Sequence, residues 1–177
     1  MIRLLVRALI SRYSIALIEL LIVVPMALAT FQMTKVLWKT TDLHEAMDIV
    51  SGVGIIMIAL GVVLEERKAI REIFELTGGP DEARQEQLDL NCHHYGVGQL
   101  VFGLFAAMCI ELIKIPNHII YTGEADEWMV AGGTLFVVLG AFLLLRHAMA
   151  LLLFKEKAAA LEVAIRELSM VDQRDPR

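Results

Sequence analysis

The sequence predicts an all-α integral membrane protein, a four-helix bundle with a cytoplasmic helical hairpin, a C-terminal helix extension and both termini in the cytoplasm. Hydrophobic residues make up 57% of the 177 residues, against roughly 45–50% in soluble proteins. They are concentrated in four apolar blocks separated by charged stretches. Three of these blocks are long enough as they stand to cross a bilayer as a helix, which takes about 17–25 residues. Lysine and arginine gather on one side of the predicted spans, which sets the orientation.

Residues 1–14 are predicted to form a basic interfacial helix, and residues 15–38 the first transmembrane helix. Arg3 and Arg7 lie four residues apart among leucines, which suits a helix lying on anionic headgroups. A simple extension of the first span, carrying cytoplasmic positive charge, explains the same pattern. The apolar run continues past the Ala-Leu-Ala at 27–29, and Glu19 interrupts it. We therefore expect a retained span and no cleaved signal peptide.

The second span is predicted at residues 49–66, a short block that helical continuation on both sides would lengthen. Residues 67–92 are predicted to form the helical hairpin in the cytoplasm. Ile70, Ile73 and Phe74 repeat at helical spacing. Gly78 and Gly79 would end the first arm, and Pro80 with Asp81 suits the start of the second.

The third and fourth spans are predicted at residues 95–115 and 129–154. Residues 155–171 are expected to continue as a cytoplasmic helix, with Leu161, Ile165 and Leu168 on one stripe. Such a stripe is typical of packing within the protein or its oligomer. Residues 172–177 are expected to be disordered. Glycines recur in spans two, three and four; because small residues let helices approach closely in lipid, they predict a tightly packed bundle.

The charge bias predicts a multi-pass protein of the bacterial inner membrane. Arginines precede the first span, and further positive residues lie between spans two and three and after span four. These segments are therefore placed in the cytoplasm. Trp38, Tyr121 and Trp128 then fall at the outer interface, where amphipathic rings are enriched.

Ionisable residues at membrane depth mark functional sites, because their burial in hydrocarbon is costly. In the predicted topology, all four spans bring such groups to a similar inner level. We expect Glu19 to carry the charge or proton, with Arg146 as its partner. The full predicted pathway for protons or ions comprises Glu19, Glu65, Glu66, His94, Arg146 and His147. A structural Glu19–Arg146 pair, or an Arg146 side chain that reaches the headgroups, explains the same residues.

Imidazole and carboxylate groups are also the ligands of transition metals and haem. His93 or His94, facing His147, would clamp a haem or bind a metal. A weaker metal site on the outer side would use His44, Asp48 and His118. No span contains the Glu-x-x-His motif of di-iron bundles, so we expect no cofactor and keep haem or a transition metal as the alternative. On the outer side, Glu111 and Lys114 lie three apart and are expected to pair.

These features predict a small oligomeric channel or transporter for protons, ions or a small solute, without enzymatic activity. Two alternatives stay open: a non-catalytic accessory subunit of a larger membrane complex, and a haem- or metal-binding redox protein. Cys92 and Cys109 are too few for a disulfide framework. The net charge of −5 does not indicate nucleic-acid binding. The sequence contains no recognisable catalytic triad or phosphate-binding loop. The lipid bilayer and further subunits are the expected partners.

Overall fold

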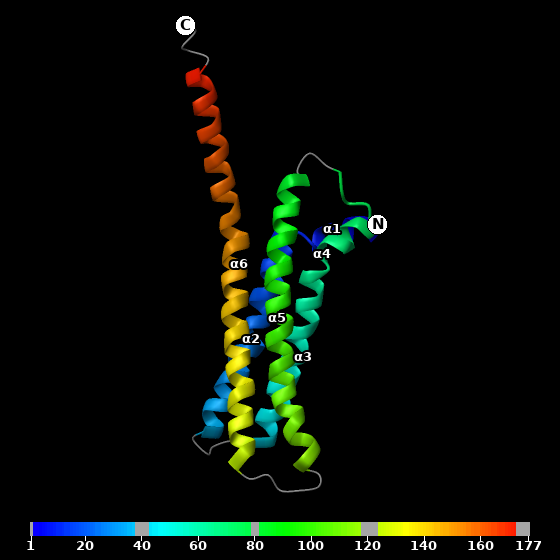
Figure 1. The fold of residues 1–177 in the computed structure, drawn as a ribbon, viewed down its shortest axis with the longest axis vertical. Coiled ribbons are helices and arrows are strands. Elements are labelled where there is room, and N and C mark those ends of the chain that lie inside the picture. The colour runs from blue at the N-terminus through cyan, green and yellow to red at the C-terminus, as the bar shows by residue number, and fades with distance from the viewer. Residues whose placement is uncertain (1, 38–42, 79–81, 118–123, 173–177) are drawn as a thin grey trace.

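The computed structural model describes residues 2–37, 43–78, 82–117 and 124–172, most of which form helices. In chain order these are α1 (Ile2–Leu9), α2 (Arg12–Leu37), α3 (Leu43–Glu65), α4 (Arg67–Ile73), α5 (Glu82–Asn117) and α6 (Glu124–Asp172) (Figure 1). Four of them, α2, α3, α5 and α6, are long and apolar enough to cross a membrane. The prediction of an all-α protein with four helices long and apolar enough to span a membrane is confirmed for the described residues.

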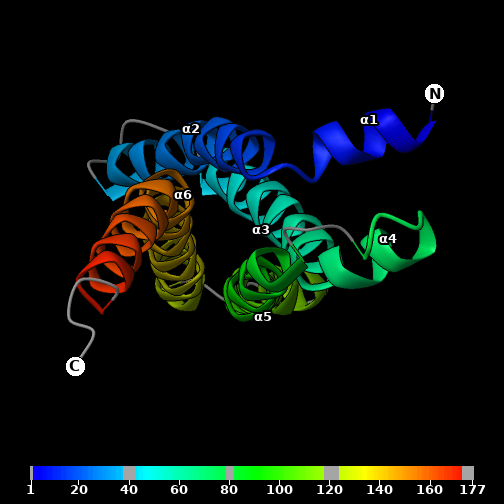
Figure 2. The same cartoon turned by 90° about the horizontal axis from the view of Figure 1, so that it is seen from above.

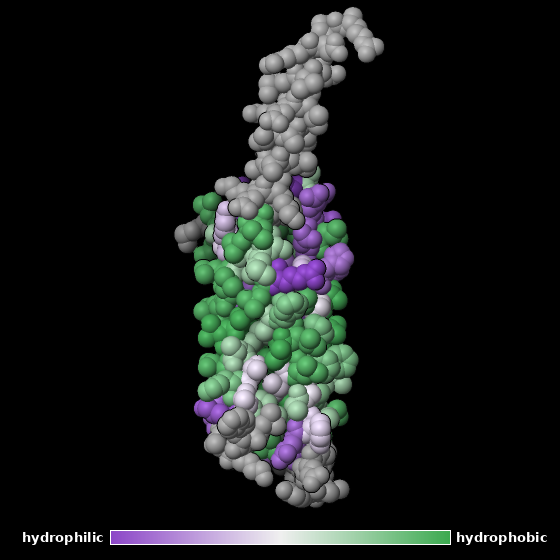
Figure 3. Space-filling view, turned by 90° about the vertical axis from the view of Figure 1, so that its left-hand side faces the viewer, coloured by the Kyte–Doolittle hydropathy of each residue, from purple (hydrophilic) through white to green (hydrophobic). Residues whose placement is uncertain are grey.

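The four long helices lie side by side, and the short helices α1 and α4 lie across one end of the bundle (Figure 1). We name this the α4 end, and the opposite end, near Lys114, the Lys114 end. In the space-filling view a broad hydrophobic band is flanked by hydrophilic side chains toward both ends (Figure 3). A band of this kind is what a multi-pass membrane protein presents to lipid.

The helices are not packed equally. α5 lies between α3 and α6, whereas α2 packs mainly on α6 and has only a thin contact with α3 (Figure 2). Methionines fill much of the shared core, and Met26, Met47 and Met57 are fully buried. Methionine is flexible and fills irregular gaps between helices. The weak α2–α3 contact leaves a groove between these two helices.

Glycines bring α3 and α5 into backbone contact. A Cβ atom on Gly61 would lie 2.6 Å from the Leu100 nitrogen and 2.8 Å from the Gly96 oxygen. A Cβ atom on Gly103 would lie 2.7 Å from the Gly54 oxygen. Within each helix the two glycines are seven residues apart, so both contacts fall on one face of each helix. These positions account for the close packing that the glycine-rich spans predict.

The helix boundaries differ from the predicted ones in three places. The hairpin predicted at residues 67–92 contributes only α4 as a separate helix, because its second arm continues without a break into the third span as α5. No proline or glycine interrupts residues 82–95. Likewise the fourth span and the predicted cytoplasmic helix are one helix, α6, and α3 begins at Leu43 rather than at residue 49. The predicted disordered tail lies outside the described residues except for Asp172, which ends α6.

The break between α1 and α2 has a local cause. Ser11 precedes α2, and its hydroxyl oxygen accepts the backbone N–H of Ser14 at 3.3 Å. This is the hydrogen bond by which a serine caps a helix N-terminus. The Ser14 hydroxyl in turn donates to the Ala8 carbonyl at 2.6 Å, near the end of α1. The chain can therefore turn here from α1, lying across the bundle, into α2.

Candidate functional site

A buried carboxylate–imidazole pair joins α2 to α6. Glu19 Oε1 lies 2.6 Å from His147 Nδ1, and neither side chain has any exposed surface. Tyr95 of α5 stacks on the imidazole, with ring centroids 4.4 Å apart and planes 24° apart. Three of the four membrane-spanning helices therefore meet at this pair. Glu19 lies about 10 Å along α2 from its start at Arg12.

The helix phase places both groups in the core. Glu19 shares the buried face of α2 with Ala16 and Met26, and His147 shares the buried face of α6 with Leu144 and Leu151. These neighbours are three to seven residues away in sequence, the spacing of one helix face. Each ionisable group thus replaces one apolar residue of a core stripe.

Several buried polar atoms around this pair have no hydrogen-bond partner among the described residues. They are Glu19 Oε2, His147 Nε2 and both amide atoms of Gln99. Gln99 lies one turn along α5 from Tyr95. A Cβ atom on Gly140 would lie 3.3 Å from Gln99 Nε2, so the amide lies farther from the α4 end than the pair. Unpartnered polar atoms are rare in protein interiors and call for an explanation.

Arg146 is not the partner of Glu19, which corrects the expected Glu19–Arg146 pair. Its side chain is exposed, whereas the adjacent His147 is buried and bonded to Glu19. Successive residues of a helix point about 100° apart, so only one of the two can face the core. The exposure of Arg146 fits the alternative in which its side chain extends toward the headgroups.

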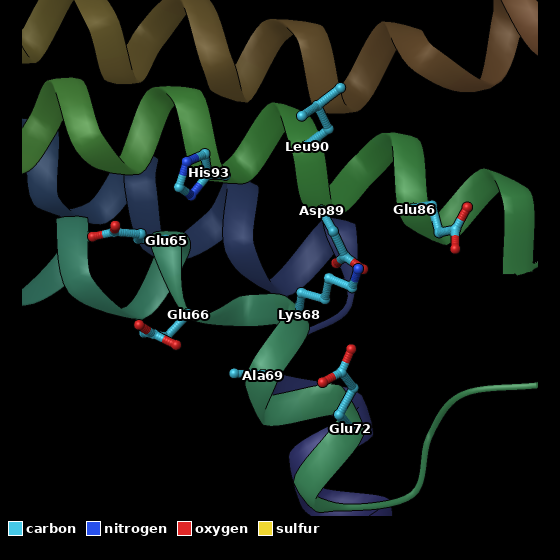
Figure 4. A pocket seen from close by; sticks show the side chains of 9 residues that line it. All are labelled: Glu65, Glu66, Lys68, Ala69, Glu72, Glu86, Asp89, Leu90 and His93. Carbon is cyan, nitrogen blue, oxygen red and sulfur yellow. The ribbon is translucent and has the colours of Figure 1, made fainter.

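Two of the other predicted pathway residues, Glu65 and Glu66, line a separate hollow at the α4 end together with His93, a predicted metal or haem ligand. It is a cavity of about 740 Å³, which Figure 4 shows between the end of α3, α4 and the first turns of α5. Further acidic groups there are Glu72, Glu86 and Asp89. His94 is exposed, and its Nδ1 lies 2.7 Å from the Leu90 carbonyl oxygen. The sealed Glu19–His147 pair is not among the residues lining this hollow.

The histidines proposed as metal or haem ligands do not converge. His147 is bonded to Glu19 and covered by Tyr95, whereas His93 and His94 are exposed. In the part of the chain that the structure describes, no three His, Cys, Asp or Glu side chains are grouped as a metal site. Of the weaker outer set, His44 and Asp48 lie in the first two turns of α3, and His118 lies outside the described residues.

A polar cluster is present at the Lys114 end. Lys114 Nζ lies 3.6 Å from Glu111 Oε1 and 3.0 Å from Asp48 Oδ1 of α3. The Ser51 hydroxyl donates to Glu111 Oε1 at 3.1 Å. Gln99 and Glu111 are about 18 Å apart along α5. The buried side chains between their levels include Val50, Val53, Met57, Ala106, Ile110 and Val137. The Thr134 hydroxyl is also buried there and donates to the Val130 carbonyl of its own helix, so a largely apolar layer separates the two polar regions.

A buried ion network at the α4 end was not predicted from the sequence. Arg67 and Arg71 of α4 both bind the carboxylate of Asp89 on α5, and all three residues are buried. Arg71 also donates to both carboxylate oxygens of Glu82, at 3.0 Å each. Two spacings in the sequence are consistent with this network. The two arginines lie four residues apart, and Glu82 and Asp89 lie seven apart, so each pair shares one helix face.

The same network holds the link between α1 and α2. Arg67 donates through Nε and one terminal nitrogen to the Ile10 carbonyl, at 3.2 and 3.1 Å. It also donates to Gln85 Oε1 at 2.9 Å. Because Ile10 lies between α1 and α2, one guanidinium connects this link to α4 and α5.

Replacing Asp89 by asparagine is expected to destabilise the protein by about 3–5 kcal/mol, because removing one partner leaves buried charges uncompensated. Here two guanidinium groups, Arg67 and Arg71, would lose their shared carboxylate. The free energy of unfolding, followed by circular dichroism in denaturant, measures the effect. Glu86→Gln is the matched control on α5, since Glu86 is exposed. Equal stability of the two variants would contradict the role given to the network.

Among the described residues, the Glu19–His147 pair with Tyr95 and the deeper Gln99 is therefore a fully buried polar site that is distinct from the ion network at the α4 end. A carboxylate and an imidazole in contact are able to exchange a proton. Comparisons with protein-family models, with curated proteins and with solved structures found no match to this chain.

Proposed function

We propose that this chain is a membrane transport protein that moves protons, with Glu19 and His147 as the groups that carry them. The observation behind this proposal is the fully buried Glu19–His147 contact of 2.6 Å between two membrane-spanning helices. Acidic and imidazole groups at membrane depth serve as proton relays, and histidine changes its charge within the physiological pH range.

A proton suits this site better than a larger ion. Neither side chain is exposed at all, so the site has no open room for a hydrated metal ion. A proton needs only to pass between Glu19 Oε1 and His147 Nδ1, with little displacement of other atoms. Gln99 offers the next polar group farther from the α4 end, and its amide can both donate and accept a hydrogen bond.

In the proposed orientation the α4 end faces the cytoplasm of a bacterial cell. This follows from the positive residues before α2, in and after α4, and near the end of the chain. The pair then lies toward the cytoplasmic side, and the apolar layer around Met57 and Ile110 is the barrier to the outer side. Proton passage would require this layer to open. Flexible methionine side chains favour such repacking.

Proton flux into proteoliposomes tests the proposal. The purified protein is reconstituted with a pH-sensitive dye inside, and a pH gradient is applied with potassium and valinomycin to compensate charge. The wild type is expected to dissipate the gradient well above empty vesicles, and Glu19→Gln to lower that rate at least tenfold. Glu45→Gln removes an exposed carboxylate on α3 and is expected to keep the wild-type rate. Wild-type vesicles as tight as empty ones would overturn the proposal.

The docking of a second subunit is the other candidate function. α6 continues to Asp172 and extends well past the other helices at the α4 end (Figure 1). A long projecting helix is what an accessory subunit or a homo-oligomer would use for helix–helix contact. A folded wild type that carries no protons would favour this candidate.

A further inference from the structure

We propose that the joint between α1 and α2 binds one anionic phospholipid, with the phosphate at Arg12 and Arg84 and an acyl chain between α2 and α3. This site is independent of the Glu19–His147 pair. It rests on two neighbouring hollows of opposite character and on an unpartnered guanidinium nitrogen.

The first hollow is an aliphatic groove of about 410 Å³. Aliphatic residues of α1, α2 and α3 form its walls, among them Leu9, Ile18, Ile56, Ala59 and Val63, and no polar residue lines it. It exists because α2 packs mainly on α6 and only thinly on α3. An apolar groove that opens between two membrane-spanning helices faces the hydrocarbon of the bilayer, so a lipid chain is its natural occupant.

The second hollow is basic and has a volume of about 240 Å³. Arg12, Arg67 and Arg84 line it together with Ser11, Tyr13 and Gln85, and no carboxylate is among the lining residues. The charge of Arg67 is balanced by Asp89. Arg12 and Arg84 therefore give the hollow its net positive charge.

Arg12 has a donor nitrogen with no acceptor among the residues that the structure describes. One of its terminal nitrogens is buried without a hydrogen-bond partner. The other donates to the Tyr13 hydroxyl, and the guanidinium lies 4.4 Å from the centre of the Tyr13 ring. Stacking on an aromatic ring holds an arginine in place for binding phosphate, and guanidinium–phosphate hydrogen bonds are among the strongest in proteins.

The two hollows are joined by the chain itself. Leu9 and Ile10 line the groove, the next residues Ser11 and Arg12 line the basic hollow, and Ile15 lines the groove again. α1 lies across the end of the bundle, where headgroups would be (Figure 2). One lipid molecule can therefore place its phosphate at Arg12 and a chain along Ile18 and Ile56. Basic pockets at such positions bind lipid headgroups.

The charge of the hollow favours an anionic lipid over a zwitterionic one. A choline or ethanolamine headgroup carries a cation, which needs a nearby acid, and no acid lines the hollow. A glycerol headgroup carries only the phosphate charge. We therefore expect phosphatidylglycerol to bind and phosphatidylcholine to bind much more weakly.

Native mass spectrometry of delipidated protein, titrated with either lipid, tests the site. Phosphatidylglycerol is expected to bind at least tenfold more tightly than phosphatidylcholine, and Arg12→Gln/Arg84→Gln to abolish that preference. Arg3→Gln/Arg7→Gln removes the same charge from α1 at positions that line neither the basic hollow nor the groove, and is expected to keep the preference. Equal affinity for the two lipids in the wild type, or equal loss in both double variants, would overturn the proposal.

A second variant tests the groove without touching the charges. Ala59→Phe places a ring in the groove and is expected to weaken phosphatidylglycerol binding at least fivefold. Ala150→Phe adds the same ring to an exposed position of α6 and is expected to have no effect. Glycerol phosphate, which lacks chains, is expected not to compete; competition by glycerol phosphate would identify an anion site rather than a lipid site. Circular dichroism of each variant shows that the helices are intact.

Discussion

Gly61→Ala is expected to lower the thermal stability of the protein markedly, although it adds a single methyl group. The new Cβ atom would lie 2.6 Å from the Leu100 nitrogen and 2.8 Å from the Gly96 oxygen. Both are backbone atoms and cannot rotate away, so α3 and α5 must move apart. Overpacking of this kind costs about 1–3 kcal/mol, and sometimes more. Because lipid provides no hydrophobic force that presses helices together, the lost close contact is not recovered elsewhere.

Two other glycines of α3 serve as graded controls for this substitution, because a Cβ atom would be less crowded at each of them. A Cβ atom on Gly54 would lie 3.0 Å from its nearest neighbours, and one on Gly52 would meet nothing within 4 Å. The expected order of unfolding temperatures in one detergent is therefore Gly52→Ala highest, Gly54→Ala intermediate and Gly61→Ala lowest. Gly52→Ala is expected to equal or exceed the wild type, since alanine favours the helix by about 0.8–1 kcal/mol. A Gly61→Ala protein as stable as Gly52→Ala would rule out the backbone contact between α3 and α5.

Hydropathy is sufficient to predict the four spans but not which face of each span lies in the core. The reason is physical: the lipid-facing and core-facing sides of a membrane helix are both apolar, so the phase has little sequence signal. Arg146 and His147 show the consequence. Both residues lie at about the depth of Glu19, so depth alone allows either one to be its partner. The rotation of α6 about its axis decides between them, because it buries His147 and exposes Arg146. Leucines precede both residues at helical spacing, Leu143 before Arg146 and Leu144 before His147, so the sequence does not decide which of the two faces the core.

The ion network at the α4 end could not be predicted for a different reason. Arg67 and Asp89 are 22 residues apart, and their meeting depends on how the chain reverses after α4. Gly78 has a positive φ of 85°, a conformation that glycine adopts readily, and its N–H donates to Glu82 Oε2 at 2.9 Å. The Gly-Gly-Pro signal predicts a turn here. It does not predict that the turn buries Asp89 between two arginines.

Glu19→Leu and His147→Leu are each expected to destabilise the protein by about 3–5 kcal/mol, because either change leaves a buried polar group without its partner. The double variant is expected to recover most of this loss. Replacing a whole buried pair by apolar residues is often neutral or stabilising, and both positions lie on otherwise apolar core faces. Unfolding of the wild type, the two single variants and the double variant gives the coupling energy between Glu19 and His147.

The double variant also separates a structural role of the pair from proton transport. If the pair only holds α2 against α6, the stable double variant keeps any transport activity that the wild type has. If the pair carries protons, the double variant is stable and its proteoliposomes are as tight as empty vesicles. We expect the second result, since Glu19 Oε2, His147 Nε2 and the Gln99 amide are buried without partners in the described part of the chain, an arrangement that a purely structural clamp does not need. A stable double variant with wild-type proton flux would exclude the pair as the carrier.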